Sequence, residues 1–98
     1  MIYKEGLVSV LMSCYNSENT IQKSIESILD QTYEDFELLI MNDASTDNTF
    51  EILKNYEIKS KKIKIFSNKV NIGLTKSLNI LINESRGEFI ARQDADDE

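Results

Sequence analysis

The chain has 98 residues, of which 41% are hydrophobic, and this size suits a single small folded unit with one core. Its 17 acidic and 11 basic residues give a net charge of -6, which argues against a broad attraction for nucleic acid or for an anionic membrane surface. No apolar run reaches the roughly 18 residues of a membrane-spanning helix, and residues 1–6 lack the apolar stretch of a signal peptide. We therefore expect a cytoplasmic protein.

Short apolar runs alternate with amphipathic patterns along the chain. Runs rich in β-branched or aromatic residues predict strands over residues 7–12, 36–41, 63–66 and 88–91. Between them, apolar residues at helical spacing predict three helices, which start after residues 16–18, after residues 45–47 and after Gly73. The first two polar segments can cap the helices that follow them, and Gly87 is expected to end the third helix.

This order predicts an α/β fold, in which right-handed crossovers build a mostly parallel sheet with helices on both faces. The first two strands are apolar enough for central positions. Residues 63–66 include the charged Lys64 and suit an edge. The single cysteine, Cys14, is interpreted as a small apolar side chain at a strand end, because the chain has no histidine to activate a thiol.

Polar residues follow each predicted strand, at the edge where open parallel sheets bind ligands. The most informative group follows the fourth strand, where Asp94 and Asp96 alternate across one residue. Both carboxylates could turn toward one Mg²⁺ or Mn²⁺, a hard cation that prefers oxygen ligands and could bridge the phosphates of a nucleotide. A solvated acidic segment is the equal alternative for these residues taken by themselves.

The other polar groups have open alternatives. Asp43 follows the second strand, and we favour contact with a ribose hydroxyl or a base N–H over helix capping. Asn71 and Gly73 could present amides to a ligand or form a structural turn. Arg92 could reach a phosphate or pair with the neighbouring acids. No Gly-x-Gly-x-x-Gly or Walker motif occurs, which argues against ordinary dinucleotide enzymes and P-loop hydrolases.

In this order and spacing, the motifs resemble the amino-terminal part of family 2 glycosyltransferases, which have a GT-A fold. Each motif alone is weak, and together they are highly specific. The resemblance rests on residues 8–16 (VSVLMSCYN) with Glu18 and Ile21, residues 27–33 (SILDQTY), residues 36–49 (FELLIMNDASTDNT), residues 71–74 (NIGL) and residues 87–97 (GEFIARQDADD).

The resemblance implies a role for each group of polar residues. The segment Cys14, Tyr15 and Asn16, with Glu18, would line a nucleoside pocket, and Asp43 would contact the base or ribose. Asp94-Ala95-Asp96 would be the family's Asp-x-Asp motif, in which Asp96 is the main Mn²⁺ or Mg²⁺ ligand and Asp94 contacts ribose or metal. With Asn71, Gly73 and Arg92, these residues form the expected nucleotide-sugar and metal site.

Three positions depart from the family's commonest pattern. Cys14 stands where proline or a small residue is frequent, Asn42 where an aspartate often stands, and Ala44 where glycine is usual. All three lie in or beside the expected nucleoside pocket, so they bear on which base it accepts.

The resemblance also implies an inverting transfer of a sugar from a nucleotide-diphosphate sugar, with a UDP-sugar favoured, to a hydroxyl of a sugar or lipid-linked acceptor. The family's general base is expected beyond Glu98, so no catalytic residue is named. We therefore expect residues 1–98 to be a single partial domain, a Rossmann-like GT-A half truncated after its fourth strand and inactive alone. A non-catalytic nucleotide- or metal-binding module is the alternative.

A sheet that stops at its fourth strand leaves one edge without a partner. Its unpaired edge could support self-association. The full-length protein is expected in the cytoplasm, with the inner face of the membrane as a second possible location.

Overall fold

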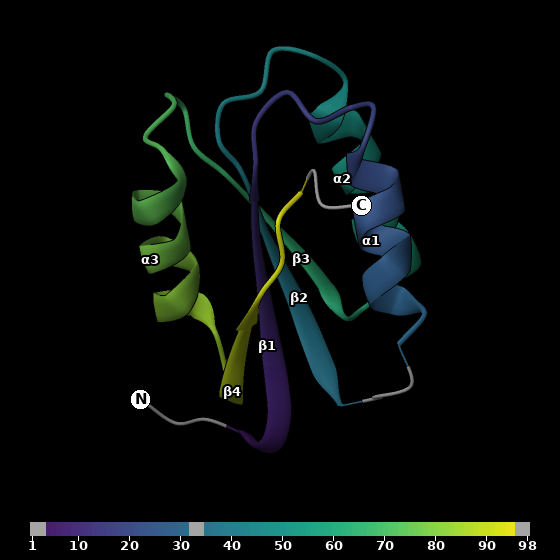
Figure 1. The fold of residues 1–98 in the computed structure, drawn as a ribbon, viewed down its shortest axis with the longest axis vertical. Coiled ribbons are helices and arrows are strands. Elements are labelled where there is room, and N and C mark those ends of the chain that lie inside the picture. Colours follow the sequence, from purple (N-terminus) through teal and green to yellow (C-terminus); the bar gives the residue numbers. More distant parts are fainter. Residues whose placement is uncertain (1–3, 32–34, 96–98) are drawn as a thin grey trace.

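The computed structural model describes residues 4–31 and 35–95. The predicted alternation of strands and helices is confirmed, and β1 differs most from its predicted length because it continues through Gly6. Figure 1 shows the elements, which are β1 (Lys4–Cys14), α1 (Ile21–Leu29), β2 (Phe36–Asn42), α2 (Thr49–Lys59), β3 (Ile63–Ser67), α3 (Leu74–Glu84) and β4 (Gly87–Arg92).

The four strands form one parallel sheet in the order β3-β2-β1-β4. The prediction that the first two strands are central and that the third lies at an edge is confirmed. The chain runs outward from β1 to β2 and β3, and then returns across the sheet to place β4 on the other side of β1. This reversal makes the carboxyl ends of β1 and β4 the topological switch point of the sheet, where open α/β sheets bind ligands.

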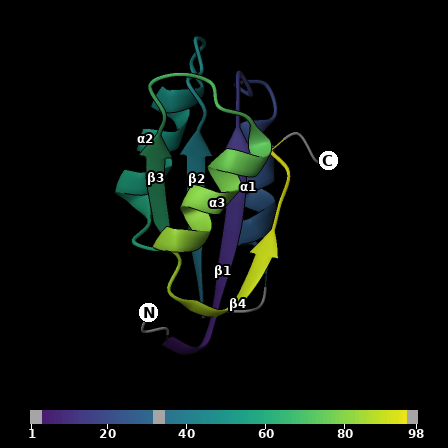
Figure 2. The same cartoon turned by 90° about the vertical axis from the view of Figure 1, so that its left-hand side faces the viewer.

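Helices cover both faces of the sheet, as predicted. Figure 1 shows α1 and α2 on one face and α3 on the other, and Figure 2 turns α3 toward the viewer. Because side chains alternate along a strand, Val10 and Met12 pack under α1 and α2, while Leu11 packs under α3. All seven residues of β2 are buried. Within residues 4–31 and 35–95, no helix has the length and apolar character needed to cross a bilayer.

The predictions about the helix ends had mixed outcomes. Capping of α1 by the side chains of residues 16–18 was wrong, because the N-cap is Thr20 and the backbone carbonyl of Ser17 accepts the N–H groups of Thr20 and Ile21. The N-cap of α2 is Asn48, whose side chain makes no cap hydrogen bond. Capping by residues 45–47 is confirmed for Asp47 alone, because its Oδ1 accepts the N–H of Thr49 at 2.9 Å.

The prediction that Gly87 ends α3 was also wrong. The helix ends at Glu84, and Gly87 is the first residue of β4. Glycine is needed there because a Cβ atom would lie 2.5 Å from Ser9 Oγ and 2.8 Å from the carbonyl oxygen of Leu7. The close approach of β4 to β1 therefore explains this glycine better than helix termination does.

Among the described residues, no strand pairs with the outer edge of β4. In the part of the chain that the structure describes, β4 pairs with β1 alone, and the side chains of Phe89 and Ile90 are about half exposed. Self-association through this edge stays a prediction.

Candidate functional site

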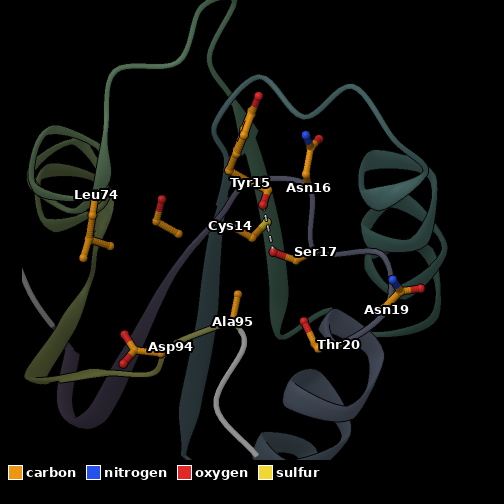
Figure 3. Close-up of a pocket in the computed structure, with 10 residues that line it drawn as sticks. Cys14, Tyr15, Asn16, Ser17, Asn19, Thr20, Leu74, Asp94 and Ala95 are labelled. Atoms are coloured by element: carbon orange, nitrogen blue, oxygen red, sulfur yellow. Dashed lines mark hydrogen bonds between the residues drawn. The ribbon is translucent and has the colours of Figure 1, made fainter.

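A pocket of about 450 Å³ lies at the switch point of the sheet. In Figure 3, Leu74 and Asp94 lie on one side of it, Asn19 and Thr20 lie on the other, and Ala95 lies between them. The lining comes from the end of β1, the loop after it, the start of α3 and the chain after β4, and consists of Ser13, Cys14, Tyr15, Asn16, Ser17, Asn19, Thr20, Leu74, Asp94 and Ala95. Its position and mixed polar and apolar lining fit a small-molecule site.

The structure brings five of the predicted site residues into this pocket, namely Cys14, Tyr15, Asn16, Asp94 and Ala95. A second group lies outside the lining and consists of Glu18, Asp43, Asn71, Gly73 and Arg92. The predicted metal ligand Asp96 lies outside the described residues. The pocket therefore joins the first and last predicted segments, which are about eighty residues apart in the chain.

Sequence reasoning missed five lining residues. Ser13, Ser17, Asn19 and Thr20 belong to the polar stretch that follows the first strand, so a wider reading of that stretch could have included them. Leu74 gave no such signal, because an apolar residue at a helix start looks like any core residue until the fold places it beside Asp94.

Asn16 and Glu18 connect the loop after β1 to the loop after β2. Asn16 Oδ1 accepts the N–H of Thr46 at 2.7 Å, and Glu18 Oε1 accepts the N–H of Asn48 at 3.1 Å. In the opposite direction, the N–H of Ser17 donates to Thr49 Oγ1 at 2.8 Å. The two loops therefore form one hydrogen-bonded unit that fixes the polar wall of the pocket.

Two residues of this unit have positive φ angles. Asn16 has φ of 49° and Ala44 has φ of 64°, a region in which glycine is the least strained residue and asparagine is better tolerated than alanine. Glycine would adopt this left-handed conformation at position 44 with less strain than alanine. The loop keeps this shape with alanine partly because Asn42 Oδ1 accepts the N–H of Ser45 at 3.1 Å.

Asp43 is buried, and both of its carboxylate oxygens accept hydrogen bonds from the segment before α3. Oδ1 accepts Asn68 Nδ2 and the N–H of Ile72, and Oδ2 accepts the N–H of Gly73, each at 2.9 Å. Gly73 has φ of 92°, so this turn requires glycine. Asn71 Nδ2 also donates to the carbonyl of Asp43 at 3.3 Å. Asp43 therefore holds the loop that delivers Leu74 to the pocket.

Cys14 behaves as the sequence predicted, as a buried apolar side chain at a strand end. It is 3% exposed, and its Sγ atom lies 3.4 Å from the carbonyl oxygen of Met41. Burial, with the nearby negative charges of Asp47 and Asp43, raises the pKa of the Cys14 thiol to about 12. A thiol that stays protonated at neutral pH is a poor nucleophile and a poor metal ligand.

Asp94 carries the exposed carboxylate of the pocket. Its side chain is 55% exposed, and Arg92 Nη2 lies 3.3 Å from its Oδ1 atom, so the structure shows the pairing alternative for Arg92. An exposed carboxylate is a chemically suitable ligand for Mg²⁺ or Mn²⁺. Within residues 4–31 and 35–95, no three His, Cys, Asp or Glu side chains gather closely enough to hold a metal by themselves.

Comparison with known proteins identifies the family. The model for glycosyl transferase family 2 matches residues 9–98. EpsE of Bacillus subtilis, named as a glycosyltransferase, is 50% identical over 91 residues, which are 92% of this chain and 33% of EpsE. The Escherichia coli enzyme WfgD, a UDP-Glc:alpha-D-GlcNAc-diphosphoundecaprenol beta-1,3-glucosyltransferase, is 42% identical over 93% of this chain and 35% of WfgD.

Solved structures agree with this identification. TarS of S. aureus, residues 1–349 in complex with UDP-GlcNAc, has a TM-score of 0.85 and 31% identity over 92% of this chain and 26% of that 1–349 chain. The chain thus spans about a third or less of the length of these relatives. The sequence match, the parallel sheet and the GT-A neighbours together show that the chain belongs to glycosyl transferase family 2.

Proposed function

We propose that this chain forms the donor site of an inverting glycosyltransferase, where it binds a nucleotide-diphosphate sugar together with Mn²⁺ or Mg²⁺. The observation that carries the proposal is the pocket at the switch point, which joins the loop after β1 to Asp94 and Ala95 after β4. A site at this place can hold a nucleoside against the first loop and present its phosphates to the acidic segment.

The chemistry of the lining supports this orientation. Tyr15 is 49% exposed and offers an aromatic face and a hydroxyl, and Asn16, Ser17 and Thr20 add donors and acceptors that suit a ribose and a base. TarS, which is 31% identical, was solved with UDP-GlcNAc, and the name of WfgD specifies UDP-Glc as donor. A UDP-sugar is therefore the favoured donor for this chain.

The acidic charge of the chain supports a need for a divalent cation. A net charge of -6 and the carboxylate of Asp94 would repel a diphosphate unless a cation lay between them. Asp94 and Asp96 are the residues that would hold it. When bound, such a cation neutralises charge on the departing diphosphate.

The residues of this chain bind and orient the donor, and the acceptor and general base come from elsewhere in the protein. The acceptor is a hydroxyl of a sugar or a lipid-linked sugar, and a carboxylate outside these residues removes its proton during attack on the anomeric carbon. The 98-residue chain alone is accordingly inactive in sugar transfer. The full-length protein works in the cytoplasm or at the inner face of the membrane.

The decisive experiment is calorimetric titration of the chain with UDP, GDP, CDP and dTDP, first with Mn²⁺ and then with a chelator. We expect binding of one nucleotide, with UDP the favoured one, that depends on Mn²⁺. Asp94→Ala and Asp96→Ala should each reduce this binding by about tenfold or more, because a charge-assisted contact to the metal is lost. Asp30→Ala is a matched control, because Asp30 is exposed at the far end of α1.

Two outcomes would contradict the proposal. One is the absence of nucleotide binding by a chain whose circular dichroism and cooperative unfolding show that it is folded. The other is binding that is equally strong in Mn²⁺ and in chelator and unaffected by both aspartate substitutions. Sugar transfer by the chain alone would contradict only the statement that the base lies elsewhere.

A further inference from the structure

Ser24 makes a buried contact that connects α1 to the acidic segment after β4. Its Oγ atom donates to the backbone carbonyl oxygen of Ala95 at 2.5 Å, across 71 positions of sequence. The Ser24 side chain is 1% exposed and Ala95 is 6% exposed, so the contact is shielded from water.

Ser24 is a polar residue on an otherwise apolar helix face. It lies on the buried face of α1 with Ile21, Ile25 and Ile28, a face that would accept an apolar residue. Because a buried carbonyl without a partner costs free energy, the hydroxyl favours the backbone position of Ala95 that the structure shows.

Ala95 is held by a second kind of contact as well. Its methyl group packs in the core formed by β1, β2 and the first two helices. Two positions earlier, the N–H of Gln93 donates to the carbonyl oxygen of Leu11 at 3.0 Å and attaches the end of β4 to β1. Asp94 therefore lies between two fixed points of backbone, while its own side chain is exposed in the pocket.

We infer that Ser24 is a positioning residue for the acidic segment: its hydroxyl fixes the backbone at Ala95, directly after Asp94, so that the Asp94 carboxylate is held in the pocket where it can act on a cation. This inference rests on the proposed donor site. Ser24 does not itself line the pocket, and its effect passes through the carbonyl of Ala95. The advantage is preorganisation, because a segment that is already ordered loses less freedom when metal and nucleotide bind.

The test compares UDP affinity with and without Mn²⁺ for the wild-type chain, Ser24→Ala, Ser24→Thr and Ser27→Ala. Ser24→Ala removes the hydroxyl and keeps the helix, and we expect it to weaken Mn²⁺-dependent UDP binding about threefold to tenfold while leaving metal-free binding unchanged. Ser24→Thr keeps the hydroxyl and should restore most of the Mn²⁺ dependence. Ser27→Ala changes an exposed serine of the same helix and should match the wild type.

A purely structural role for Ser24 predicts a different pattern. In that case Ser24→Ala lowers the unfolding temperature, while the ratio of UDP affinities with and without Mn²⁺ stays at the wild-type value below that temperature. That result overturns the inference, as does a Ser24→Thr variant that folds and binds as weakly as Ser24→Ala.

A second readout covers the case in which the added methyl of threonine prevents folding. The electron paramagnetic resonance spectrum of Mn²⁺ bound with UDP to Ser24→Ala should then differ from the wild-type spectrum, and an unchanged spectrum counts against the inference. If the wild-type chain shows no Mn²⁺-dependent binding, the proposed donor site and the role of Ser24 fail together. If the wild-type chain shows Mn²⁺-dependent UDP binding and Ser24→Ala shows the same binding, the donor site stands and the role of Ser24 is wrong.

Discussion

Two buried carboxylates lie at opposite ends of the same strand. Glu37 is the second residue of β2 and is 6% exposed, while Asp43 directly follows the strand and is 3% exposed. Glu37 lies at the end of the sheet away from the pocket, and Asp43 lies at the pocket end. Glu37 accepts hydrogen bonds from other strands or the residue before one, and so stabilises the sheet. Asp43 accepts hydrogen bonds from the loop before α3, and so shapes the pocket.

Glu37 connects β2 to the middle of β1, to the start of β3 and to the residue before β4. Its Oε2 atom accepts Ser9 Oγ at 2.6 Å and the N–H of Arg86 at 2.7 Å, while Lys64 Nζ lies 3.4 Å from Oε1. Ser9 Oγ in turn accepts the N–H of Gly87 at 2.7 Å. Burial raises the pKa of Glu37, but the hydrogen bonds from Ser9 and Arg86 and the charge of Lys64 outweigh it and lower the pKa below its ordinary value.

Asp43 has no cation among its hydrogen-bond partners in the described structure, which are two backbone N–H groups and the Asn68 amide. Burial raises the pKa of Asp43, but the hydrogen bonds from Ile72, Asn68 and Gly73 outweigh it and lower the pKa. Both oxygens of each residue accept a donor, but the donors to Asp43 come from one loop, whereas those to Glu37 come from other strands or the residue before one. A buried acid beside a pocket can thus serve the site by holding a loop.

The largest expected effect comes from adding a methyl group at Gly87, where β4 lies close to β1 at the Glu37 end of the sheet. Gly87→Ala should lower the free energy of unfolding by about 3 kcal/mol, because the new methyl group would overlap Ser9 and the backbone of β1. Urea unfolding followed by circular dichroism measures the loss. Arg86→Ala is the control, because it keeps the backbone N–H that Glu37 accepts. Equal stability of the two variants would contradict this account.

Asp43→Asn should have the next largest effect. Asparagine has one acceptor oxygen, so its NH₂ group must face a backbone N–H or the Asn68 amide, and at least one hydrogen bond is lost. We expect a loss of about 2 kcal/mol in the same urea assay. Faster amide hydrogen exchange at Ile72 and Gly73 should accompany it, and unchanged exchange there would show that the loop does not depend on the carboxylate.

Glu37→Gln is the matched substitution at the other end and should cost less, about 1 kcal/mol. A glutamine oxygen can keep the hydrogen bonds from Ser9 and Arg86, while its NH₂ group faces Lys64, whose half-exposed side chain can move into solvent. The comparison therefore predicts that Asp43→Asn is the more destabilising of the pair. A higher urea midpoint for Asp43→Asn than for Glu37→Gln would contradict this comparison.

Acid titration should have the smallest and most gradual effect. Both carboxyl groups have a lower pKa in the folded chain than their ordinary values of 4.5 for Glu37 and 3.8 for Asp43. The stability that they contribute is therefore complete above these ordinary values and is lost as pH falls through the lower folded values. Between about pH 6 and about pH 3, Glu37→Gln and Asp43→Asn should each lose less stability than the wild type, because each lacks one of these carboxyl groups. Parallel pH profiles for all three proteins would contradict the assignment.

Much of the fold follows from sequence pattern. Alternating apolar runs and helical spacing predicted all seven elements, because burial of one face or one stripe sets those periods locally. The apolar character of the first two strands and the charge of Lys64 predicted their central and edge positions. The meeting of the segments around Cys14, Asn16 and Asp94 at one pocket could also be predicted, because polar residues that follow parallel strands meet at one edge of the sheet.

The partners of individual side chains were decided by tertiary structure. Gly87 was predicted to end a helix and is a point of close strand contact. Ser24 carried no sequence signal of its own, and its hydroxyl donates to the backbone carbonyl of Ala95. The expected ligand contact of Asp43 stays a prediction, and only the structure shows that its two oxygens accept donors from a loop about thirty residues later. Local pattern records which face of an element is buried, whereas a hydrogen bond between distant segments depends on the register and approach of elements that only the assembled sheet defines.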